Sequence, residues 1–308
     1  MRRLLIAALI CTGALQAEAP CLAACEFYGN FEVGVHALVF VPMICEYDYA
    51  TVAATSGNLP VASATCQLDW GFRLFGRYLS DCSFAHLSYQ WYESKVTDSA
   101  GAPFTIFRGG FVAQRGTAQL HLEYQNFDVR VGSYLHRSSC YRSFVFGNVR
   151  WIDLDYRRTV RPNDGTGNVQ RLNEKSDFEG AALGVGAGLE LDLPCSFGLF
   201  GEANLLGVFA QRSATNVLTD NGGNRAPVKY ETDDCISPEM AWRFGLSYTY
   251  ICGFLEIQGE VGYEFDYFWK AIAFPQRLTE GQQFLEGRFR RCEDVGFSGL
   301  FFGLRLAI

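Results

Sequence analysis

Hydrophobic and polar side chains alternate along most of the chain. Over residues 27–41 the odd positions carry Phe, Gly, Val or Ala, whereas the even positions include Tyr28, Glu32 and His36. A period of two is that of a β-strand, in which successive side chains point to opposite faces. This segment is therefore predicted to be a strand with one face suited to lipid and one suited to water.

Nine further segments repeat the alternation. In one of them the hydrophobic positions change parity near Gln125 and Asn126 without a turn residue, which predicts a β-bulge inside one long strand. The last segment alternates up to Ile308. The nine segments cover residues 68–77, 85–91, 118–131, 145–151, 183–193, 199–209, 240–250, 255–266 and 300–308.

The segments are joined by connections of two length classes in alternation. Short turns and long external loops, with an even strand count, are the layout of a bacterial outer-membrane barrel. We therefore predict an all-β fold, a transmembrane antiparallel β-barrel of about ten strands within a range of eight to twelve. The short turns lie near residues 80–82, 136–141, 194–196 and 251–253, and the long polar loops near 43–65, 97–113, 159–177, 211–235 and 270–293.

A secreted β-sandwich is the alternative fold. It also alternates, because one face of each of its sheets is wet. Its loops would not separate by length, however, and its bulky aromatic side chains would not collect at the ends of the apolar faces. The two-class pattern of connections favours the barrel.

The N-terminus has the pattern of an export signal. Two arginines follow Met1, an apolar run extends to Ala17, and Ala17-Glu18-Ala19 is an A-x-A cleavage site. We predict a signal peptide over residues 1–19 and a barrel over residues 20–308. The minor alternative is a lipid anchor on Cys25, since residues 22–25 resemble an acylation box.

Composition excludes two other classes of protein. After the signal segment no run approaches the eighteen apolar residues of a membrane-spanning helix. Removing Arg2, Arg3 and Glu18 changes the formal net charge from −7 to −8. An acidic exported chain of this kind is not expected to bind nucleic acid.

Five motifs resemble a known family in their order along residues 65–308. They resemble the Legionella-type major outer-membrane protein family of pore-forming barrels, which also occurs among chlamydia-like bacteria. The resemblance implies a porin that admits ions and small hydrophilic solutes by passive diffusion. Two features depart from it, because Ile308 stands where such barrels usually end in an aromatic residue and cysteine is more frequent than expected. The motifs lie at 127–132, 178–188, 244–248, 262–268 and 299–304.

Cysteines mark both ends of the predicted barrel. Ten remain after Cys11 leaves with the signal peptide, an even number in an oxidising compartment. Two pairs on the outer side are candidate disulfides, whose connectivity stays open. The six on the periplasmic side are either ordinary reduced or locally paired thiols, or links to neighbouring envelope proteins that resemble the cross-linked envelopes of chlamydia-like bacteria. The outer pairs are Cys45 with Cys66 and Cys235 with Cys292; the periplasmic set is Cys21, Cys25, Cys82, Cys140, Cys195 and Cys252.

The polar face of the strands is dense in charge. In a wet pore these side chains set ion selectivity, and the acidic excess favours a weak cation preference. In a narrow barrel they pair across the lumen as structure, and the sequence leaves both readings open. The pore-lining candidates are Glu32, Asp69, Arg73, Arg77, Glu123, Arg130, Arg150, Glu202, Arg243, Glu256, Glu260, Glu264 and Arg305, and Glu190, Asp192 and Asp266 share their phase.

Catalysis and adhesion are the competing functions. An outer-membrane hydrolase could combine a carboxylate and Ser88 with His36, His86 or His121, which are expected in the lumen, but no nucleophile motif accompanies them. We therefore predict no catalytic residue, no cofactor and no metal. The external loops offer an adhesive surface without a recognisable ligand motif. Candidate partners are outer-membrane lipid, further copies of the chain and disulfide-linked envelope proteins.

Overall fold

The computed structural model describes residues 30–44, 48–52, 61–63, 67–106, 112–138, 140–163, 171–219, 222–223, 225–252, 255–275 and 290–307. The predicted signal peptide lies outside these residues. The strands are β1 (Asn30–Ile44), β2 (Asp48–Val52), β3 (Val61–Ser63), β4 (Asp69–Leu79), β5 (Ser83–Ile106), β6 (Val112–Arg137), β7 (Tyr141–Asn163), β8 (Arg171–Asp192), β9 (Phe197–Thr219), β10 (Arg225–Cys252), β11 (Leu255–Pro275) and β12 (Arg290–Ala307). A short 3₁₀ segment, η1 (Pro194–Ser196), lies between β8 and β9.

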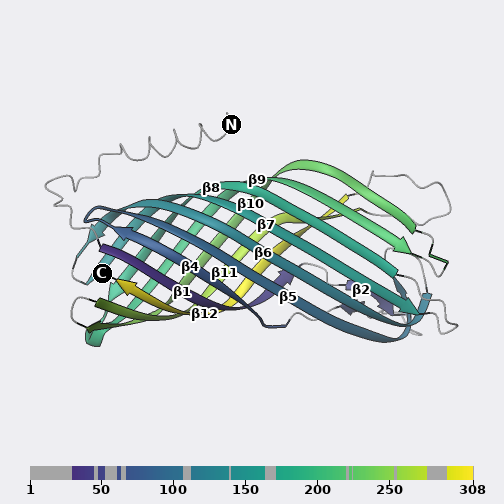
Figure 1. Cartoon of the computed structure of the whole chain (residues 1–308), viewed down its shortest axis with the longest axis horizontal. Helices are drawn as coiled ribbons and strands as arrows, with labels where there is room; N and C mark the ends of the chain where they lie inside the picture. Colours follow the sequence, from purple (N-terminus) through teal and green to yellow (C-terminus); the bar gives the residue numbers. More distant parts are fainter. Residues whose placement is uncertain are drawn as a thin grey trace.

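Ten of the strands form a closed antiparallel barrel (Figure 1). Strands β4 to β12 each pair with the next, and β1 closes the wall by pairing with both β4 and β12. The remaining two, β2 and β3, form a hairpin in which β2 pairs with the outer end of β5. The predicted all-β barrel of about ten strands is confirmed.

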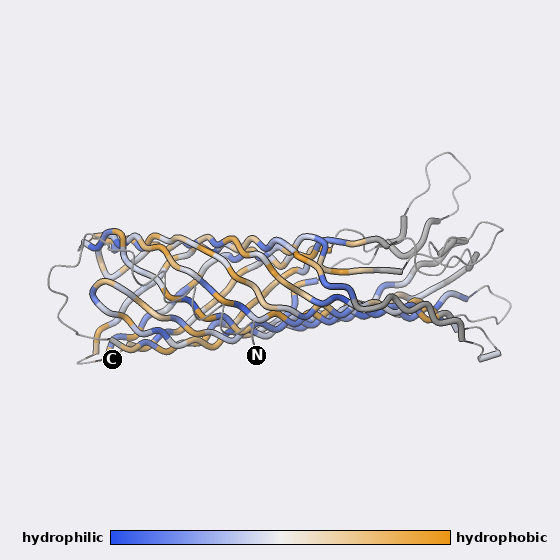
Figure 2. Tube along the Cα trace, turned by 90° about the horizontal axis from the view of Figure 1, so that it is seen from above, coloured by the Kyte–Doolittle hydropathy of each residue, from blue (hydrophilic) through white to orange (hydrophobic). Residues whose placement is uncertain are grey.

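The strands are much longer than a membrane requires. A transmembrane β-strand needs about 9–11 residues, whereas β7 has 23 and β10 has 28. The barrel wall therefore extends far beyond the lipid at the end opposite the short turns. Figure 2 shows the elongated tube that these strands form. Three predicted loops, at 97–113, 159–177 and 211–235, are consequently wrong in extent, because most of their residues belong to strands.

The alternation changes phase along each long strand, and β7 shows how. In the lipid-embedded part its inward side chains include the polar Asn148 and Arg150, and its outward ones are apolar, as at Trp151. Further along, Ile152 and Leu154 point inward and are buried, whereas Asp155 points outward. Where the wall lies in lipid, its outer face must be apolar. Where the wall lies in water, its inner face must be apolar instead, because that face forms the core. The part of the wall beyond the lipid is thus built like a soluble barrel.

The same change of phase explains the parity flip in β6. Gln125 pairs with Trp91 and Asn126 with Gln90 in an unbroken ladder. The predicted bulge is therefore wrong at this place. The hydrophobic positions change parity because the strand leaves the lipid there, while its backbone continues without an extra residue.

Glycines on the inner face of β8 make room for aromatic rings. A Cβ atom at Gly186 would lie 2.3 Å from Cζ of Phe146, and one at Gly188 would lie 2.3 Å from Cζ of Phe144. Because Phe146 pairs with Gly186 and Phe144 with Gly188, each ring lies over the glycine opposite it on the neighbouring strand.

Among the described residues, no helix is long and apolar enough to cross a membrane.

Candidate functional site in the barrel lumen

The lumen in the lipid-embedded part of the barrel is filled with charged side chains. Buried ionisable groups at membrane depth are costly, and by default they mark a functional path. Each guanidinium here lies within 4.0 Å of at least one carboxylate on another strand. The six arginines are Arg73, Arg77, Arg130, Arg150, Arg243 and Arg305.

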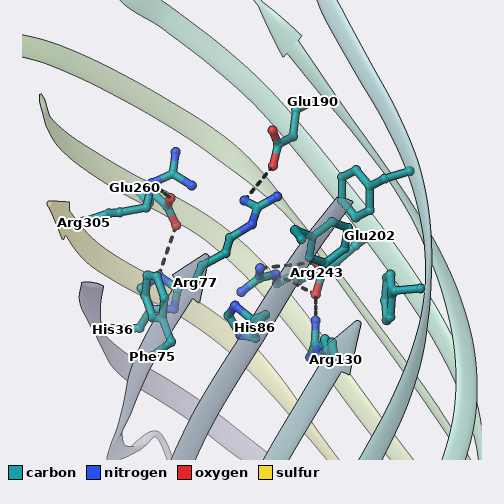
Figure 3. A pocket seen from close by; sticks show the side chains of 13 residues that line it. His36, Phe75, Arg77, His86, Arg130, Glu190, Glu202, Arg243, Glu260 and Arg305 are labelled. Carbon is teal, nitrogen blue, oxygen red and sulfur yellow. Dashed lines mark hydrogen bonds and ion pairs between the residues drawn. The ribbon is translucent and has the colours of Figure 1, made fainter. Parts of the chain in front are cut away.

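The group nearest the short turns surrounds Arg77, which points to the centre of Figure 3. Its Nη1 donates to Oε1 of Glu190 at 3.2 Å and lies 3.9 Å from Oε2 of Glu32. Arg305 donates to the same Glu32 oxygen at 3.3 Å. Glu260 lies 3.6 Å from Nε of Arg305. Charges from β1, β4, β8, β11 and β12 therefore form one network across the lumen.

A histidine joins this network from β1. Nε2 of His36 lies 3.0 Å from Oε2 of Glu260, and Figure 3 shows the ring beside Phe75. The centroids of the His36 and Phe75 rings are 4.8 Å apart. His36 is buried, and a Cβ on Gly303 would lie 2.2 Å from its ring, so the glycine leaves space for it. The geometry fixes His36 as a partner of a carboxylate in the lumen wall.

A second group surrounds Arg130 on β6. Its Nε donates to Oδ2 of Asp128 at 2.6 Å and its Nη1 to Oε1 of Glu202 at 2.5 Å. Arg243 approaches the same Glu202 carboxylate, with Nε 2.9 Å from Oε1. His86 lines the same cavity (Figure 3). Two arginines on opposite sides thus share one glutamate.

A third group lies closest to the outer edge of the lipid. Nη1 of Arg73 donates to Oε2 of Glu264 at 2.9 Å. Arg150 donates to Oδ2 of Asp128 at 3.2 Å, to Oδ2 of Asp266 at 3.4 Å and to Glu239. One guanidinium is therefore shared among three carboxyl groups.

Aromatic rings line the lumen at the end with the short turns. The guanidinium carbon of Arg77 lies 5.0 Å from the ring centroid of Phe84, and that of Arg130 lies 5.3 Å from the centroid of Phe146. Such cation–π contacts are stabilising, and more so where the groups are desolvated. The cluster consists of Leu79, Phe84, Tyr134, Phe144 and Phe146.

An apolar core, here called the apolar plug, fills the lumen beyond the charged groups. Rings from opposite walls meet there, since the centroid of Tyr124 on β6 lies 4.6 Å from that of Phe297 on β12. Tyr92 of β5 packs edge-on against Phe297 at 5.5 Å. Its largest side chains, none more than 2% exposed, are Phe40, Tyr92, Tyr124, Tyr156, Phe178, Phe268, Phe297 and Phe301.

Little free space remains between the charged side chains. The cavity around Arg77 and Arg130 has a volume of ≈ 40 Å³, and a second of ≈ 40 Å³ next to it extends to Leu191 and Asp192 at the end with the short turns. A buried water needs only about 10–15 Å³ of such volume. These cavities accommodate a few waters and exclude a hydrated solute in this conformation.

Most of the pore-lining candidates do face the lumen. Asp69 accepts from Oγ of Ser94 at 2.6 Å near the plug, and Glu256 lies in the inward phase at the end with the short turns. The structure unites the other inward candidates into the three groups described above, and these are Glu32, Arg73, Arg77, Arg130, Arg150, Glu202, Arg243, Glu260, Glu264 and Arg305.

Glu123 is the exception, and its assignment to the pore is wrong. Its Oε1 accepts from Nε1 of Trp91 at 3.3 Å and from Nε2 of Gln125 at 2.9 Å on the outer surface. His121 also points outward, where Nε2 lies 2.8 Å from Oε1 of Glu93. Both residues lie beyond the change of phase, where the outward positions, which face lipid nearer the turns, face water and carry polar side chains.

Two central carboxylates are absent from the pore-lining candidates. Asp128 and Glu239 hold Arg150, and both are almost fully buried. The signal for them was present in the sequence, because Asp128 shares its phase with Arg130 and Glu239 shares its phase with Arg243. Only the pairing across the lumen, which alternation does not encode, shows that they are its centre.

The four turn cysteines lie together at one end of the barrel. The carbonyl oxygen of Cys82 accepts from the backbone N–H of Tyr134 at 3.0 Å in one of these turns. Cys140, Cys195 and Cys252 are exposed there. Cys21 and Cys25 lie outside the described residues.

The outer cysteine pairs stay predictions. Cys45 and Cys66 lie outside the described residues. Cys235 and Cys292 are half-buried, and Cys235 packs against the apolar plug. Whether oxidation joins them is an open prediction.

Comparisons with known proteins agree with this architecture. A profile of the family described as Legionella pneumophila major outer membrane protein precursor matches residues 22–308. The chain is similar to the outer-membrane protease OmpT of Escherichia coli, with a TM-score of 0.51 and 11% identity over 92% of this chain and 99% of that one. It is less similar to the toluene transporter TodX of Pseudomonas putida, with a TM-score of 0.34 and 10% identity over 96% of this chain and 93% of that one. No curated protein matches. At such identity the likeness to OmpT shows the fold alone.

Proposed function

Because the chain belongs to the Legionella pneumophila major outer membrane protein family, and is therefore a barrel of the bacterial outer membrane, we propose that it is a gated channel and not an enzyme. Its substrates are ions and small hydrophilic solutes, which move by passive diffusion. The supporting observation is the lumen of paired charges that runs through the lipid-embedded wall. Charged side chains that encircle a lumen in this way set ion selectivity in membrane channels.

The apolar plug is the gate in this proposal. Hydrophobic constrictions close channels because water and ions avoid them. In the described conformation Tyr92, Tyr124 and Phe297 meet across the lumen with no exposed surface. Conduction therefore requires these rings to move apart and the paired charged side chains below them to rearrange, because the cavities between those side chains exclude a hydrated solute in the described conformation.

A closed structural barrel is the second candidate function. It is favoured by the complete pairing of the lumen arginines, since narrow barrels fill their interior with side chains. In this case the long wall beyond the lipid presents its polar surface to the medium, and no solute passes. A folded but silent barrel is what this candidate predicts.

Planar-bilayer conductance of the Phe297→Ala variant separates the two functions. We expect the wild type to open rarely and the variant to show frequent discrete steps, because the ring that bridges the lumen is gone. Phe302→Ala is the matched control, since Phe302 lies on the same strand and faces lipid. Heat-modifiable migration on gels verifies folding. A folded Phe297→Ala barrel that is as silent as the wild type would refute the channel and leave the structural barrel.

The exposed turn cysteines support a further part of the function. We propose that Cys140, Cys195 and Cys252 form disulfides with neighbouring envelope proteins and stabilise the envelope. Exposed thiols on one rim are accessible to partners in the oxidising periplasm. Non-reducing gels of intact envelopes should show reductant-sensitive oligomers that the triple Cys→Ser variant lacks. Monomer in both samples would contradict this proposal.

The remaining partners are also proposals. The outward apolar side chains between the turns and the change of phase are proposed to contact outer-membrane lipid directly. Association with further copies of the chain is proposed as well, and chemical cross-linking of membranes from the triple Cys→Ser variant tests it without interference from disulfides. Only monomer after cross-linking would count against a homo-oligomer.

A further inference from the structure

The carboxyl groups around Arg150 are not balanced by positive charge. Asp128, Glu239 and Asp266 all lie within 3.4 Å or less of its guanidinium nitrogens, and none of these residues is more than 4% exposed. Asp128 is also held by Arg130. Glu239 and Asp266 therefore share one guanidinium between them.

Among the described residues, the arginines of the neighbouring strands already hold other carboxylates. Arg73 is bound to Glu264 on β11, and Arg243 is bound to Glu202 on β9. From β6 the phenol of Tyr124 donates to Oδ2 of Asp266 at 3.1 Å. The other charged or titratable groups that face the cluster are Asp128 and Arg130 of β6 and His86 of β5, whereas β1 and β12 contribute the apolar rings of Phe40, Phe297 and Phe301.

Glu239 and Asp266 also share one nitrogen of that guanidinium. Oε1 of Glu239 and Oδ2 of Asp266 both accept from Nη1 of Arg150. Oε2 of Glu239 and Oδ1 of Asp266 receive no donor from any described residue, although both side chains are almost completely buried. Two buried carboxylates held at one guanidinium nitrogen repel each other, which disfavours ionisation of both, and one proton on the pair removes this repulsion.

We propose that Glu239 and Asp266 form a proton-binding site in the lumen and that loss of its proton opens the apolar plug. The link is Tyr124, because its hydroxyl donates to Asp266 while its ring stacks on Phe297. When the pair carries a second negative charge, the two carboxylates repel each other. This repulsion displaces Asp266 and so disturbs the position of Tyr124, which donates to it. The proton site stands on the geometry alone, whereas its effect on opening rests on the proposed channel function.

Infrared spectroscopy of the folded full-length barrel in lipid tests the site directly. We expect a carboxylic-acid C=O band at neutral pH that shifts in D2O. The band should be lost in Glu239→Gln, because the amide donates to Asp266 and replaces the proton. Asp266→Asn provides the same test should that variant fail to fold. The band should persist in Glu179→Gln, which removes an outward-facing carboxyl group. Absence of the band in the wild type would overturn the proposal.

Conductance then tests the effect on opening. The open probability of the wild type should rise severalfold from neutral to alkaline pH, and Glu239→Gln should abolish that rise. A wild type with the infrared band and a pH-independent open probability would overturn the regulatory part. Silence of the wild type and of Phe297→Ala at every pH, with the band present, would refute the channel function and leave the proton site intact.

Discussion

Trp151 and Asp153 lie two positions apart on the outward face of β7, and the outer boundary of the lipid passes between them. The outward side chains before Trp151 include Val145 and Val149, whereas those after Asp153 include Asp155. Aromatic side chains commonly form a girdle at this boundary. The position of the membrane on the barrel can thus be tested residue by residue.

Val145→Arg should destabilise the barrel by about 2–4 kcal/mol, because the charge enters the middle of the apolar band. Thr159→Arg, on the same face of β7 beyond the boundary, should change the stability by about 0.5 kcal/mol or less. Denaturant titration of the refolded proteins in lipid vesicles measures both values. Equal costs at the two positions would mean that the boundary is misplaced.

The sequence predicted the barrel from its period but misjudged where the strands end. At Asp153 and Asp155 the outward positions of β7 become polar, while the inward positions become apolar. A search for apolar outward positions therefore takes this part of the strand for a polar loop. The position of Glu123 was wrong for the same reason, because inward and outward exchange their polarity at the membrane boundary. A search for period two without an assumed polarity would have extended β7 through these residues.

Asp153→Asn should slightly stabilise the barrel at neutral pH. Burial, with the charges of Glu179 and Asp155, raises the pKa of Asp153 above its usual range, so the ionised carboxylate is unfavourable in the folded state. The gain is expected to be about 0.5 kcal/mol or less for a partly exposed group. It should disappear as the pH falls below about 4, where this carboxyl is protonated in both states.

Asp155→Asn is the control, and it should destabilise the barrel at neutral pH instead of stabilising it. Burial raises the pKa of Asp155, but the hydrogen bond from Arg157 and the charge of Lys175 outweigh it, and the pKa is lowered. This contribution to stability is present at neutral pH and is lost as the pH falls through the folded-state pKa. Thermal unfolding at several pH values compares the variants. Shifts of the same sign in both would contradict the charge arrangement.

Gly186→Ala should impair folding. Its Cβ would lie 2.3 Å from Cζ of Phe146 and 2.7 Å from the carbonyl oxygen of Ala203, so ring and backbone must move, at a cost of about 1–3 kcal/mol. Gly207→Ala is the control, since nothing lies within 4 Å of a Cβ there. The folded fraction on heat-modifiability gels should fall only in the first variant. Normal folding of both would show that Phe146 has room to rearrange.

The candidate site was only partly predictable. Phase along a strand indicated that Arg150 and Glu264 face the lumen, because each strand's alternation is a local property. The partners of these two charges lie on distant strands, since Arg150 and Glu239 are 89 positions apart and Arg73 and Glu264 are 191 apart. The order and register of the closed sheet bring them together, and no single segment contains that information.

Arg150→Met should destabilise the barrel more than any of the preceding substitutions. Removing one member of a buried ion-pair cluster leaves uncompensated charge, typically at a cost of about 3–5 kcal/mol. Arg157→Met removes an arginine from the exposed face of the same strand, where its pair with Asp155 is worth about 1 kcal/mol at most. Denaturant titration in lipid vesicles compares the two variants.

Removing the carboxyl groups around Arg150 as well tests whether the loss of stability in Arg150→Met is electrostatic. Combining Arg150→Met with Glu239→Gln and Asp266→Asn removes the uncompensated charges and should restore most of the lost stability, since apolar replacement of a whole buried ion cluster is often neutral. Failure of the triple variant to recover would mean that the shape of the Arg150 side chain, and not its charge, holds the lumen together at this level.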